Sequence, residues 1–372
     1  MFGKKKKGVD PAAVLDVLRT VQDPDLHRDI VSLNFIKDLQ VEGTKVSFKV
    51  ELTTPACPVK EQLKAECHSK VSALPGVESV AIEMTAQVRQ GNVAGGDGNI
   101  VPEVKNIIAV ASGKGGVGKS TTAINLALAL KHHGATVGLL DADVYGPSQA
   151  MMFGIEGQPH VTPDKKLIPH EGYGVKVVSM GFLSSPDKPV IWRGPMVHGL
   201  LQQFLRDVVW GALDYLVIDL PPGTGDAQLS ISQLLSITGA VIVTTPQDVS
   251  LIDARKGLLM FRQMKVPVLG IVENMSYFVC PSCNERTEIF RHGGGKRISE
   301  ELGVPFLGEI PLDPVIVLGG DDGAPIVASS PDAPIAQSYL SLSTQVAAGL
   351  STLAAQDAPP HAPIMPGKIE WK

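Results

Sequence analysis

The segment 113–120 reads GKGGVGKS and fits the phosphate-binding pattern G-x-x-x-x-G-K-[ST]. An apolar run precedes it at 107–110 and an apolar helical pattern follows it to Leu130, which is the strand–loop–helix context that the pattern requires. Glycines let the backbone wrap phosphate oxygens, and a helix N-terminus offers free N–H donors. We expect Lys119 to reach the β- and γ-phosphates of ATP and Ser120 to ligate Mg²⁺. The residues of this segment expected to bind the nucleotide are Gly113, Lys114, Gly115, Gly116, Val117, Gly118, Lys119, Ser120 and Thr121.

Carboxylates follow two further apolar runs, where buried strands are expected to end. Asp141 and Asp143 come after the run 137–140, and Asp219 comes after 216–218. Carboxylates beside phosphate are costly unless they manage a metal ion or a water molecule. Their joint occurrence near a phosphate loop therefore predicts a Mg²⁺ site, although each aspartate alone could cap a following helix. Gly223, in the loop after Asp219, could lend its backbone N–H to the γ-phosphate.

Cys280 and Cys283 form the one C-x-x-C pattern of the sequence. A pair of thiolates on a tight turn supplies half of a tetrahedral zinc site or half of the ligands of a [4Fe–4S] cluster. The missing pair must come from another copy of the chain, and two copies related by a two-fold axis would supply four thiolates. The spacing leaves three hypotheses open, namely a bridging cluster, structural zinc and a dithiol redox pair.

Three more residues could offer a thiol or imidazole ligand. Cys57 stands just before Pro58 at an expected helix start, where the helix N-terminus would lower its pKa and favour a thiolate. Cys57 is therefore a possible second thiol site, with a half-buried helix-cap cysteine as the alternative. Cys67 lies in the middle of that helix and is expected to pack in the core. His292 is expected at the surface rather than as an additional ligand.

The ordered motifs of residues 107–322 resemble those of Mrp/ApbC-type iron–sulfur cluster carriers. These carriers have the deviant P-loop of the MinD, ParA and nitrogenase-iron-protein class, to which the loop with its additional Lys114 is similar. Nitrogenase-like electron transfer is disfavoured, because that branch takes a cysteine from the loop after Asp219 and residues 219–279 contain none. The matching stretches are GKGGVGKS (113–120), DADVYGPS (141–148), DLPPGTGD (219–226), TTPQDVSL (244–251) and ENMSYFVCPSC (273–283).

The resemblance implies a role for each polar residue of these motifs. Lys114 would reach across a dimer to the partner's nucleotide, and Asn274 would read adenine through its amide. Asp219 would hold Mg²⁺ through water, Asp141 would support the metal shell, and Asp143 would orient the attacking water. Asn274 alone could equally be a turn former. The residues implied in catalysis are Lys114, Lys119 and Asp143.

The function implied by the resemblance is that of a homodimer that binds ATP, hydrolyses it slowly and holds a bridging [4Fe–4S] cluster at Cys280 and Cys283. Such a protein passes its cluster to apo iron–sulfur proteins and works with cluster scaffold proteins. The loop TTPACP (53–58) resembles the small SufT-like assembly domain fused ahead of many such carriers. Two rival hypotheses are a MinD/ParA-like positioning ATPase and a zinc-bearing structural ATPase.

The chain of 372 residues is long enough for two domains. Residues 1–90 predict a small α+β domain, with a helix that Asp10 caps, a strand at 46–52, a helix over about 59–73 and a strand at 76–84. Glycine-rich residues 91–103 are expected to form a flexible linker. Residues 104–355 contain near-continuous apolar runs, at 137–140, 215–218, 240–243 and 268–272 among others, which predict a doubly wound, mostly parallel α/β sheet.

Composition and charge exclude several classes of partner. The net charge of −5 does not favour a nucleic-acid partner, and no apolar stretch is long enough to span a membrane. The proline-rich tail 356–372 is expected to be extended, so it does not offer the amphipathic membrane helix that a positioning ATPase needs. Four cysteines cannot form a disulfide scaffold, and the lysine run near the N-terminus lacks the apolar core of a leader. We therefore expect a cytoplasmic protein with reduced thiols.

Overall fold

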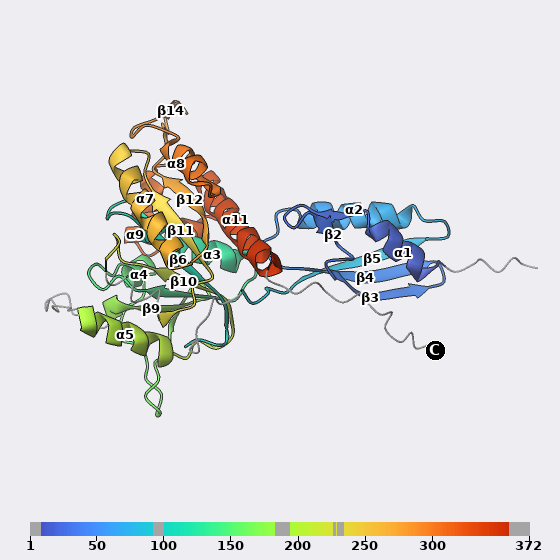
Figure 1. The fold of residues 1–372 in the computed structure, drawn as a ribbon, viewed down its shortest axis with the longest axis horizontal. Coiled ribbons are helices and arrows are strands. Elements are labelled where there is room, and N and C mark those ends of the chain that lie inside the picture. The colour runs from blue at the N-terminus through green and yellow to red at the C-terminus, as the bar shows by residue number, and fades with distance from the viewer. Residues whose placement is uncertain (1–8, 92–99, 183–193, 226–227, 229–233, 357–372) are drawn as a thin grey trace, which may run out of the picture.

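A computed structural model describes residues 9–91, 100–182, 194–225, 228 and 234–356 of the chain (Figure 1). The expected tail 356–372 beyond its first residue, the lysine run at 4–7 and the middle of the expected linker 91–103 lie outside the described residues. Within the described residues, a small unit at the N-terminal end is followed by a larger α/β unit (Figure 1). The exact division into domains stays a prediction.

The larger unit is built on one sheet of eight strands in the described residues. All neighbouring strands pair in parallel except β8 and β9, which are antiparallel. The sequence prediction of a mostly parallel sheet is therefore confirmed. The strands, in spatial order, are β15 (Phe306–Ile310), β12 (Val268–Asn274), β11 (Gly239–Thr244), β6 (Val104–Ser112), β10 (Leu213–Asp219), β7 (Val137–Asp141), β9 (Val175–Ser179) and β8 (His170–Gly172).

Helices cover both faces of this sheet, which explains why its strands are apolar throughout. Alternate residues of β6 join different cores, because Ile108 packs with Leu126 of α3 whereas Ile107 packs with Phe261 of α7. The sheet is thus doubly wound, as expected. The helical elements of this unit are α3 (Lys119–His132), α4 (Gln149–Met152), η1 (Met180–Phe182), α5 (Gly194–Arg206), α7 (Asp248–Gln263), α8 (Gly294–Leu302), α9 (Pro314–Asp321), α10 (Ile326–Ser329) and α11 (Pro334–Gln356).

The N-terminal unit is the small α+β fold that its sequence predicts. Asp10 caps the first helix, and its side chain accepts a hydrogen bond of 2.9 Å from the Ala12 N–H. A three-stranded sheet pairs β4 antiparallel to β3 and parallel to β5. Val46, Phe48 and alternate residues after them on β4 are buried in a core of this unit's own. The elements are α1 (Pro11–Leu18), β1 (Gln22–Asp23), β2 (Arg28–Asp29), β3 (Ile36–Glu42), β4 (Lys45–Leu52), α2 (Lys60–Ser72) and β5 (Ser79–Ala86).

The N-terminal unit contacts the larger unit at the amino end of the large sheet. The hydroxyls of Thr54 and Tyr215 are 3.2 Å apart and buried, and Tyr215 lies near the start of β10. Burial raises the pKa of Tyr215 to about 12, so its phenol remains protonated. Gly91, the first residue of the expected linker, packs so closely that a Cβ there would lie 2.1 Å from a methyl carbon of Thr238. The contact therefore includes this hydroxyl pair, a residue without a side chain, and two residues, Ala56 and Val88, that are buried in the core of the larger unit.

We predict that Tyr215→Phe lowers the free energy of unfolding by about 1–2 kcal/mol, because it leaves the buried Thr54 hydroxyl without this partner. Thr54→Val should cost a similar amount, since both changes remove the same contact. Urea unfolding of the wild type, both single variants and the double variant would yield a coupling energy of at least about 0.5 kcal/mol. Strictly additive losses would contradict the contact between the two units.

Candidate functional site

The phosphate loop connects the end of β6, at Ser112, to the start of α3, at Lys119. Its shape requires glycine, because Gly118 has φ +82° and a Cβ there would lie 2.0 Å from the amide nitrogen of Asn274. A Cβ at Gly113 would lie 2.2 Å from the backbone of α7. The loop is also tied internally, because the Ser112 hydroxyl donates to the Lys114 carbonyl at 2.9 Å. The strand–loop–helix context expected from the sequence is confirmed.

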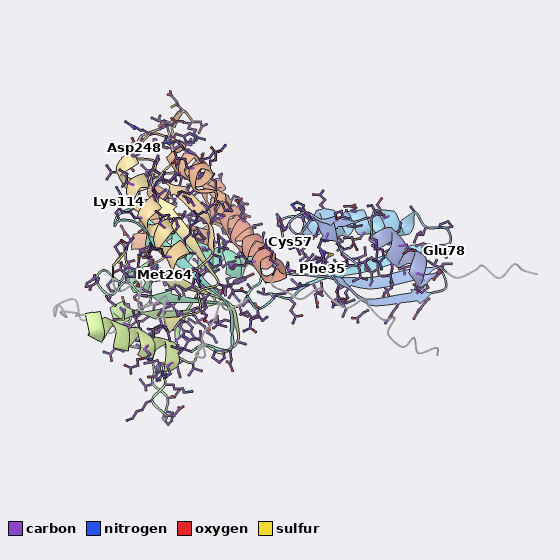
Figure 2. The ribbon with its side chains drawn as sticks, in the orientation of Figure 1. Phe35, Cys57, Glu78, Lys114, Asp248 and Met264 are labelled. Carbon is purple, nitrogen blue, oxygen red and sulfur yellow. The ribbon has the colours of Figure 1, made fainter. Side chains whose placement is uncertain are left out.

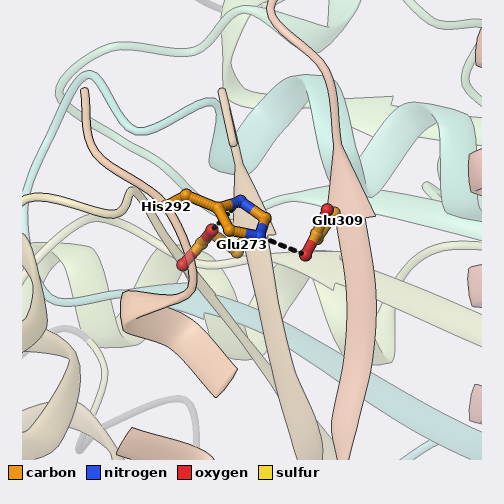
Figure 3. Close-up of side chains that lie close together, drawn as sticks. All are labelled: Glu273, His292 and Glu309. Atoms are coloured by element: carbon orange, nitrogen blue, oxygen red, sulfur yellow. Dashed lines mark ion pairs between the residues drawn. The ribbon is translucent and has the colours of Figure 1, made fainter. Parts of the chain in front are cut away.

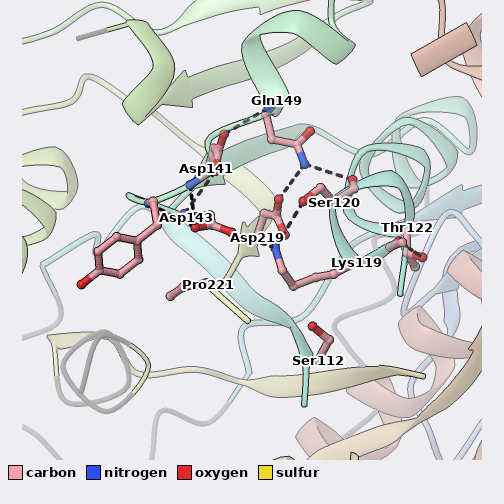
Figure 4. Close-up of polar contacts among 12 residues, drawn as sticks. Ser112, Lys119, Ser120, Thr122, Asp141, Asp143, Gln149, Asp219 and Pro221 are labelled. Atoms are coloured by element: carbon pink, nitrogen blue, oxygen red, sulfur yellow. Dashed lines mark hydrogen bonds and ion pairs between the residues drawn. The ribbon is translucent and has the colours of Figure 1, made fainter. Parts of the chain in front are cut away.

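Two aspartates lie side by side at the carboxyl end of the sheet. Asp219 ends β10 and Asp141 ends the neighbouring β7, where the two residues are register partners (Figure 4). Both are 0 % exposed. The ammonium group of Lys119, itself 6 % exposed, donates to the Oδ1 atom of Asp219 and lies 3.9 Å from the Oδ2 atom of Asp143. The lysine of the phosphate loop is thus the counter-ion of buried carboxylates.

Asp141 is held by hydrogen bonds and is not paired directly with a cation. Its Oδ2 atom accepts hydrogen bonds from the Ser179 hydroxyl at 2.8 Å and from the Gln149 N–H at 3.1 Å. Burial, followed by the adjacent charge of Asp219, raises the pKa of Asp141 to about 7. A divalent cation would offset this crowding of negative charge, and carboxylate and hydroxyl oxygens are the ligands that Mg²⁺ prefers. Asp141, Asp219 and Ser120 therefore fit a Mg²⁺ site.

A cavity of about 400 Å³ opens beside the phosphate loop. Most of the residues expected to bind the nucleotide line it, but Gly113 and Val117 do not, and Asp141 and Asp219 are not among its lining residues. Within the described part of the chain, the Lys114 side chain makes no hydrogen bond or ion pair. The lining residues that carry the argument are Lys114, Lys119, Ser120, Thr121, Asp143, Asn274 and Pro311.

Three more groups that the sequence analysis expects near the nucleotide have hydrogen-bond partners in the structure. The Oδ1 atom of Asp143 accepts hydrogen bonds from the N–H groups of Tyr145 and Gly146, at 3.2 and 3.1 Å. The amide of Asn274 donates to the Val117 carbonyl at 2.8 Å, so it braces the phosphate loop. The Gly223 N–H, expected to face a phosphate, instead donates to the Ser112 carbonyl at 2.9 Å.

Sequence reasoning missed the apolar wall of the cavity. Met151 and Met152 of α4 line it, together with Ile316 and Val317 of α9. The available signal was the pair Asp313-Pro314 ahead of an apolar run, because Asp313 caps α9 by accepting from the Val315 N–H at 2.8 Å. Such a wall suits the base or the sugar of a nucleotide better than its phosphates.

Cys280 and Cys283 lie on the turn between β13 (Phe278–Val279) and β14 (Arg286–Thr287). The Cys280 N–H donates to the Glu285 carbonyl at 3.0 Å, and the Cys280 carbonyl accepts from the Asn284 N–H at 2.8 Å. Cys280 is half-buried and Cys283 is exposed. Hydrogen bonds from the backbone N–H groups of Ser282 and Cys283 lower the pKa of the Cys280 thiol. The turn therefore offers two thiols at the surface, one of them predisposed to ionise.

A polar cluster holds this hairpin to the sheet (Figure 3). The Arg286 guanidinium lies 3.8 Å from the centre of the Tyr277 ring and donates to Glu309 of β15 at 3.2 Å. His292 is at the surface, as expected, and its Nε2 atom lies 3.4 Å from a carboxylate oxygen of Glu309. Glu273, His292 and Glu309 are close enough to share a metal ion, but Arg286 already supplies the positive charge. We interpret the cluster as the anchor of the cysteine turn.

The expectation of a low pKa for Cys57 is wrong. α2 begins at Lys60, and burial raises the pKa of Cys57, with the nearby charges of Asp25 and Asp23 adding to the effect. The hydrogen bond from the Val59 N–H lowers the pKa of Cys57, but by less than burial raises it. Cys67 is buried, as expected, and burial raises its pKa to about 12. Figure 2 shows Cys57 in the N-terminal unit, separated from Lys114 along the long axis of the molecule.

The fold and the site define a class of protein before any comparison is made. A parallel sheet whose central strand runs into a glycine-rich phosphate loop, with buried aspartates at the ends of adjacent strands, is the architecture of a P-loop NTPase. Residues 103–347 match the NUBPL iron-transfer P-loop NTPase family, and residues 11–84 match the family described as iron-sulfur cluster assembly protein. The chain therefore belongs to the family of NUBPL-type iron-transfer P-loop NTPases, and the resemblance found in its sequence motifs is confirmed.

Individual relatives agree with this assignment over nearly the whole chain. The iron-sulfur cluster carrier protein of Synechocystis sp. is 53 % identical over 347 residues, which cover 92 % of this chain and 98 % of the relative. The corresponding protein of Deinococcus radiodurans is 48 % identical over 355 residues, covering 95 % and 99 % of the two chains. A solved structure of the nucleotide-binding protein of Archaeoglobus fulgidus, in complex with ADP, is 41 % identical with a TM-score of 0.55. The match covers 63 % of this chain and 91 % of the Archaeoglobus chain.

No helix in the described ranges is long and apolar enough to cross a membrane.

We predict that, of the four cysteines, Cys280 reacts with iodoacetamide before Cys57, and Cys57 before Cys67. The lowered pKa of Cys280 makes it a thiolate at a lower pH than an ordinary thiol, whereas burial keeps Cys57 and Cys67 protonated. Peptide mass spectrometry of the metal-free protein across a pH series would measure each labelling rate. The pH of half-maximal labelling should be lowest for Cys280, and the opposite order for Cys280 and Cys57 would contradict the assignment.

Proposed function

We propose that the protein is an ATP-hydrolysing homodimer that carries an iron–sulfur cluster between Cys280 and Cys283 of two copies and transfers it to apo-proteins. The observation that carries this proposal is a two-thiol surface turn, with Cys283 exposed and Cys280 half-buried, in a chain that offers no second C-x-x-C. A [4Fe–4S] cluster takes four thiolates, so the second pair must come from a second copy. The carrier and transfer names of the relatives support iron–sulfur clusters as the cargo.

Nucleotide hydrolysis would use the groups at the carboxyl end of the sheet. Lys119 would exchange its ion pair with Asp219 for contacts to the β- and γ-phosphates, which frees Asp219 to hold Mg²⁺ through water together with Ser120. Asp141 would support that shell, and Mg²⁺ would neutralise charge on the phosphates. Asp143 faces the cavity, where its carboxylate can orient a water molecule. Asn274 would contact the base, since its amide lies at the cavity wall.

The residues described above also support a dimer, a cytoplasmic location and a set of partners for the protein. The Lys114 ammonium lines the cavity and pairs with no described residue, so it is available for a nucleotide bound to a second copy. Cytoplasmic location suits thiols that must stay reduced, and the partners would be apo iron–sulfur proteins and cluster scaffold proteins. A net charge of −5 gives no reason to add a nucleic-acid or membrane partner.

We predict that Lys119→Ala abolishes nucleotide binding, whereas Asp143→Asn binds ATP normally and hydrolyses it at least about 100-fold more slowly. Removing Lys119 also leaves Asp219 buried without its counter-ion, which should cost about 3–5 kcal/mol of stability. Calorimetric titration with ATP, phosphate release and urea unfolding would measure the three effects. Lys114→Ala is the matched control for stability, because it removes a lysine of the same loop that has no partner. Wild-type turnover by Asp143→Asn would refute its role.

We predict a stoichiometry of one cluster per dimer, which mixed dimers would test. One copy is wild type and the other carries Cys280→Ala and Cys283→Ala, so two thiolates remain and iron should fall nearly to zero after anaerobic reconstitution. Cys57→Ser homodimers are the control and should keep their iron, because Cys57 lies in the N-terminal unit. Nearly full iron in the mixed dimers would refute the bridging site. Zinc in a colourless wild-type protein would favour the structural-zinc alternative.

A further inference from the structure

Gln149, the first residue of α4, touches each part of the expected Mg²⁺ site. Its side chain is 0 % exposed. The amide nitrogen Nε2 donates to the Oδ2 atom of Asp219 at 2.8 Å and to the Ser120 carbonyl at 3.0 Å (Figure 4). The backbone N–H donates to the Oδ2 atom of Asp141 at 3.1 Å. One residue thus contacts the three residues that fit a Mg²⁺ ion.

The orientation of the Gln149 amide follows from its partners. A carboxylate oxygen and a carbonyl oxygen can only accept hydrogen bonds, so the group between them must be the NH₂ of the amide. The carbonyl oxygen Oε1 therefore lies on the other side of the amide. It is buried, and no donor in the described part of the chain is within hydrogen-bonding distance. A buried carbonyl without a donor costs about 1–3 kcal/mol, which an apolar side chain of the same size would not.

We propose that Gln149 is a positioning residue of the Mg²⁺–nucleotide site. Its NH₂ group fixes the Asp219 carboxylate beside Ser120, where the expected Mg²⁺ ion would be held. The inference rests on the nucleotide site of the proposed function and is independent of the cluster. It concerns a residue that none of the sequence patterns above includes.

The test compares ADP binding with and without Mg²⁺. Gln149→Met keeps the length of the side chain but removes both of its hydrogen-bonding atoms. We expect its ADP affinity in EDTA to stay within about twofold of wild type, and its affinity at saturating Mg²⁺ to fall about tenfold, or about 1.4 kcal/mol. Gln149→Glu keeps an oxygen at this position but removes the NH₂ group that holds Asp219, so it should not restore the wild-type Mg²⁺ dependence. Gln345→Met is the matched control, because Gln345 donates to the Leu307 carbonyl away from the site.

Each result bears on the inference. Equal weakening of Gln149→Met with and without Mg²⁺ would overturn it, because a residue that merely supports the pocket has that effect. Unchanged binding in both conditions would also overturn it. Mn²⁺ titration followed by electron paramagnetic resonance provides a readout that does not depend on activity, and the Met variant should bind Mn²⁺–ADP more weakly. Wild-type protein that binds no ADP at all would instead refute the nucleotide site of the proposed function.

Discussion

The burial of two carboxylates at adjoining strand ends is the constraint on which the rest of this molecule depends. Parallel pairing of β7 and β10 brings Asp141 and Asp219 into register with no solvent exposure. Two buried negative charges are unfavourable unless a cation offsets them, and Lys119 is the nearest one. The phosphate loop must therefore present its lysine inward to the sheet. The same crowding makes the site suited to a divalent metal ion.

The contact with the N-terminal unit and the group of buried aspartates lie at opposite ends of the strands of the large sheet. Tyr215, which meets the N-terminal unit, and Asp219, which belongs to the nucleotide site, are on the same strand. They are four residues apart, or roughly 13 Å at the usual rise per residue. The cysteine turn follows directly from β12, whose last residue is Asn274 at the nucleotide cavity. The nucleotide cavity and the cysteine turn are thus joined by a short segment, whereas Cys57 lies beyond the opposite end of the sheet.

Charged side chains hold the cysteine turn, together with backbone hydrogen bonds from the Ser276 N–H to the Ile310 carbonyl and from the Leu312 N–H to the Tyr277 carbonyl. Arg286 stacks on Tyr277 and pairs with Glu309, and Glu273 beneath them accepts hydrogen bonds from Ser276 and Gly293. Such an anchor leaves Cys283 exposed and Cys280 half-buried at the tip of the hairpin. This exposure suits the proposed bridging site, because a fully buried pair of thiols could neither meet a second copy nor release a cluster.

Local patterns in the sequence determined the phosphate loop, the parallel strands, the small α+β unit and the two-thiol turn, because each depends on residues close together in the chain. Tertiary structure alone decided which side chains meet across strands. The pairing of Lys119 with Asp219, the contacts of Gln149 and the link from Arg286 to Glu309 join distant segments. Cys57 shows the limit most clearly: the local helix start predicted a low pKa, but burial and the charges of Asp25 and Asp23 raise it. The desolvation of a titratable group depends on all the atoms packed around it, so the tertiary structure decides how far burial shifts its pKa.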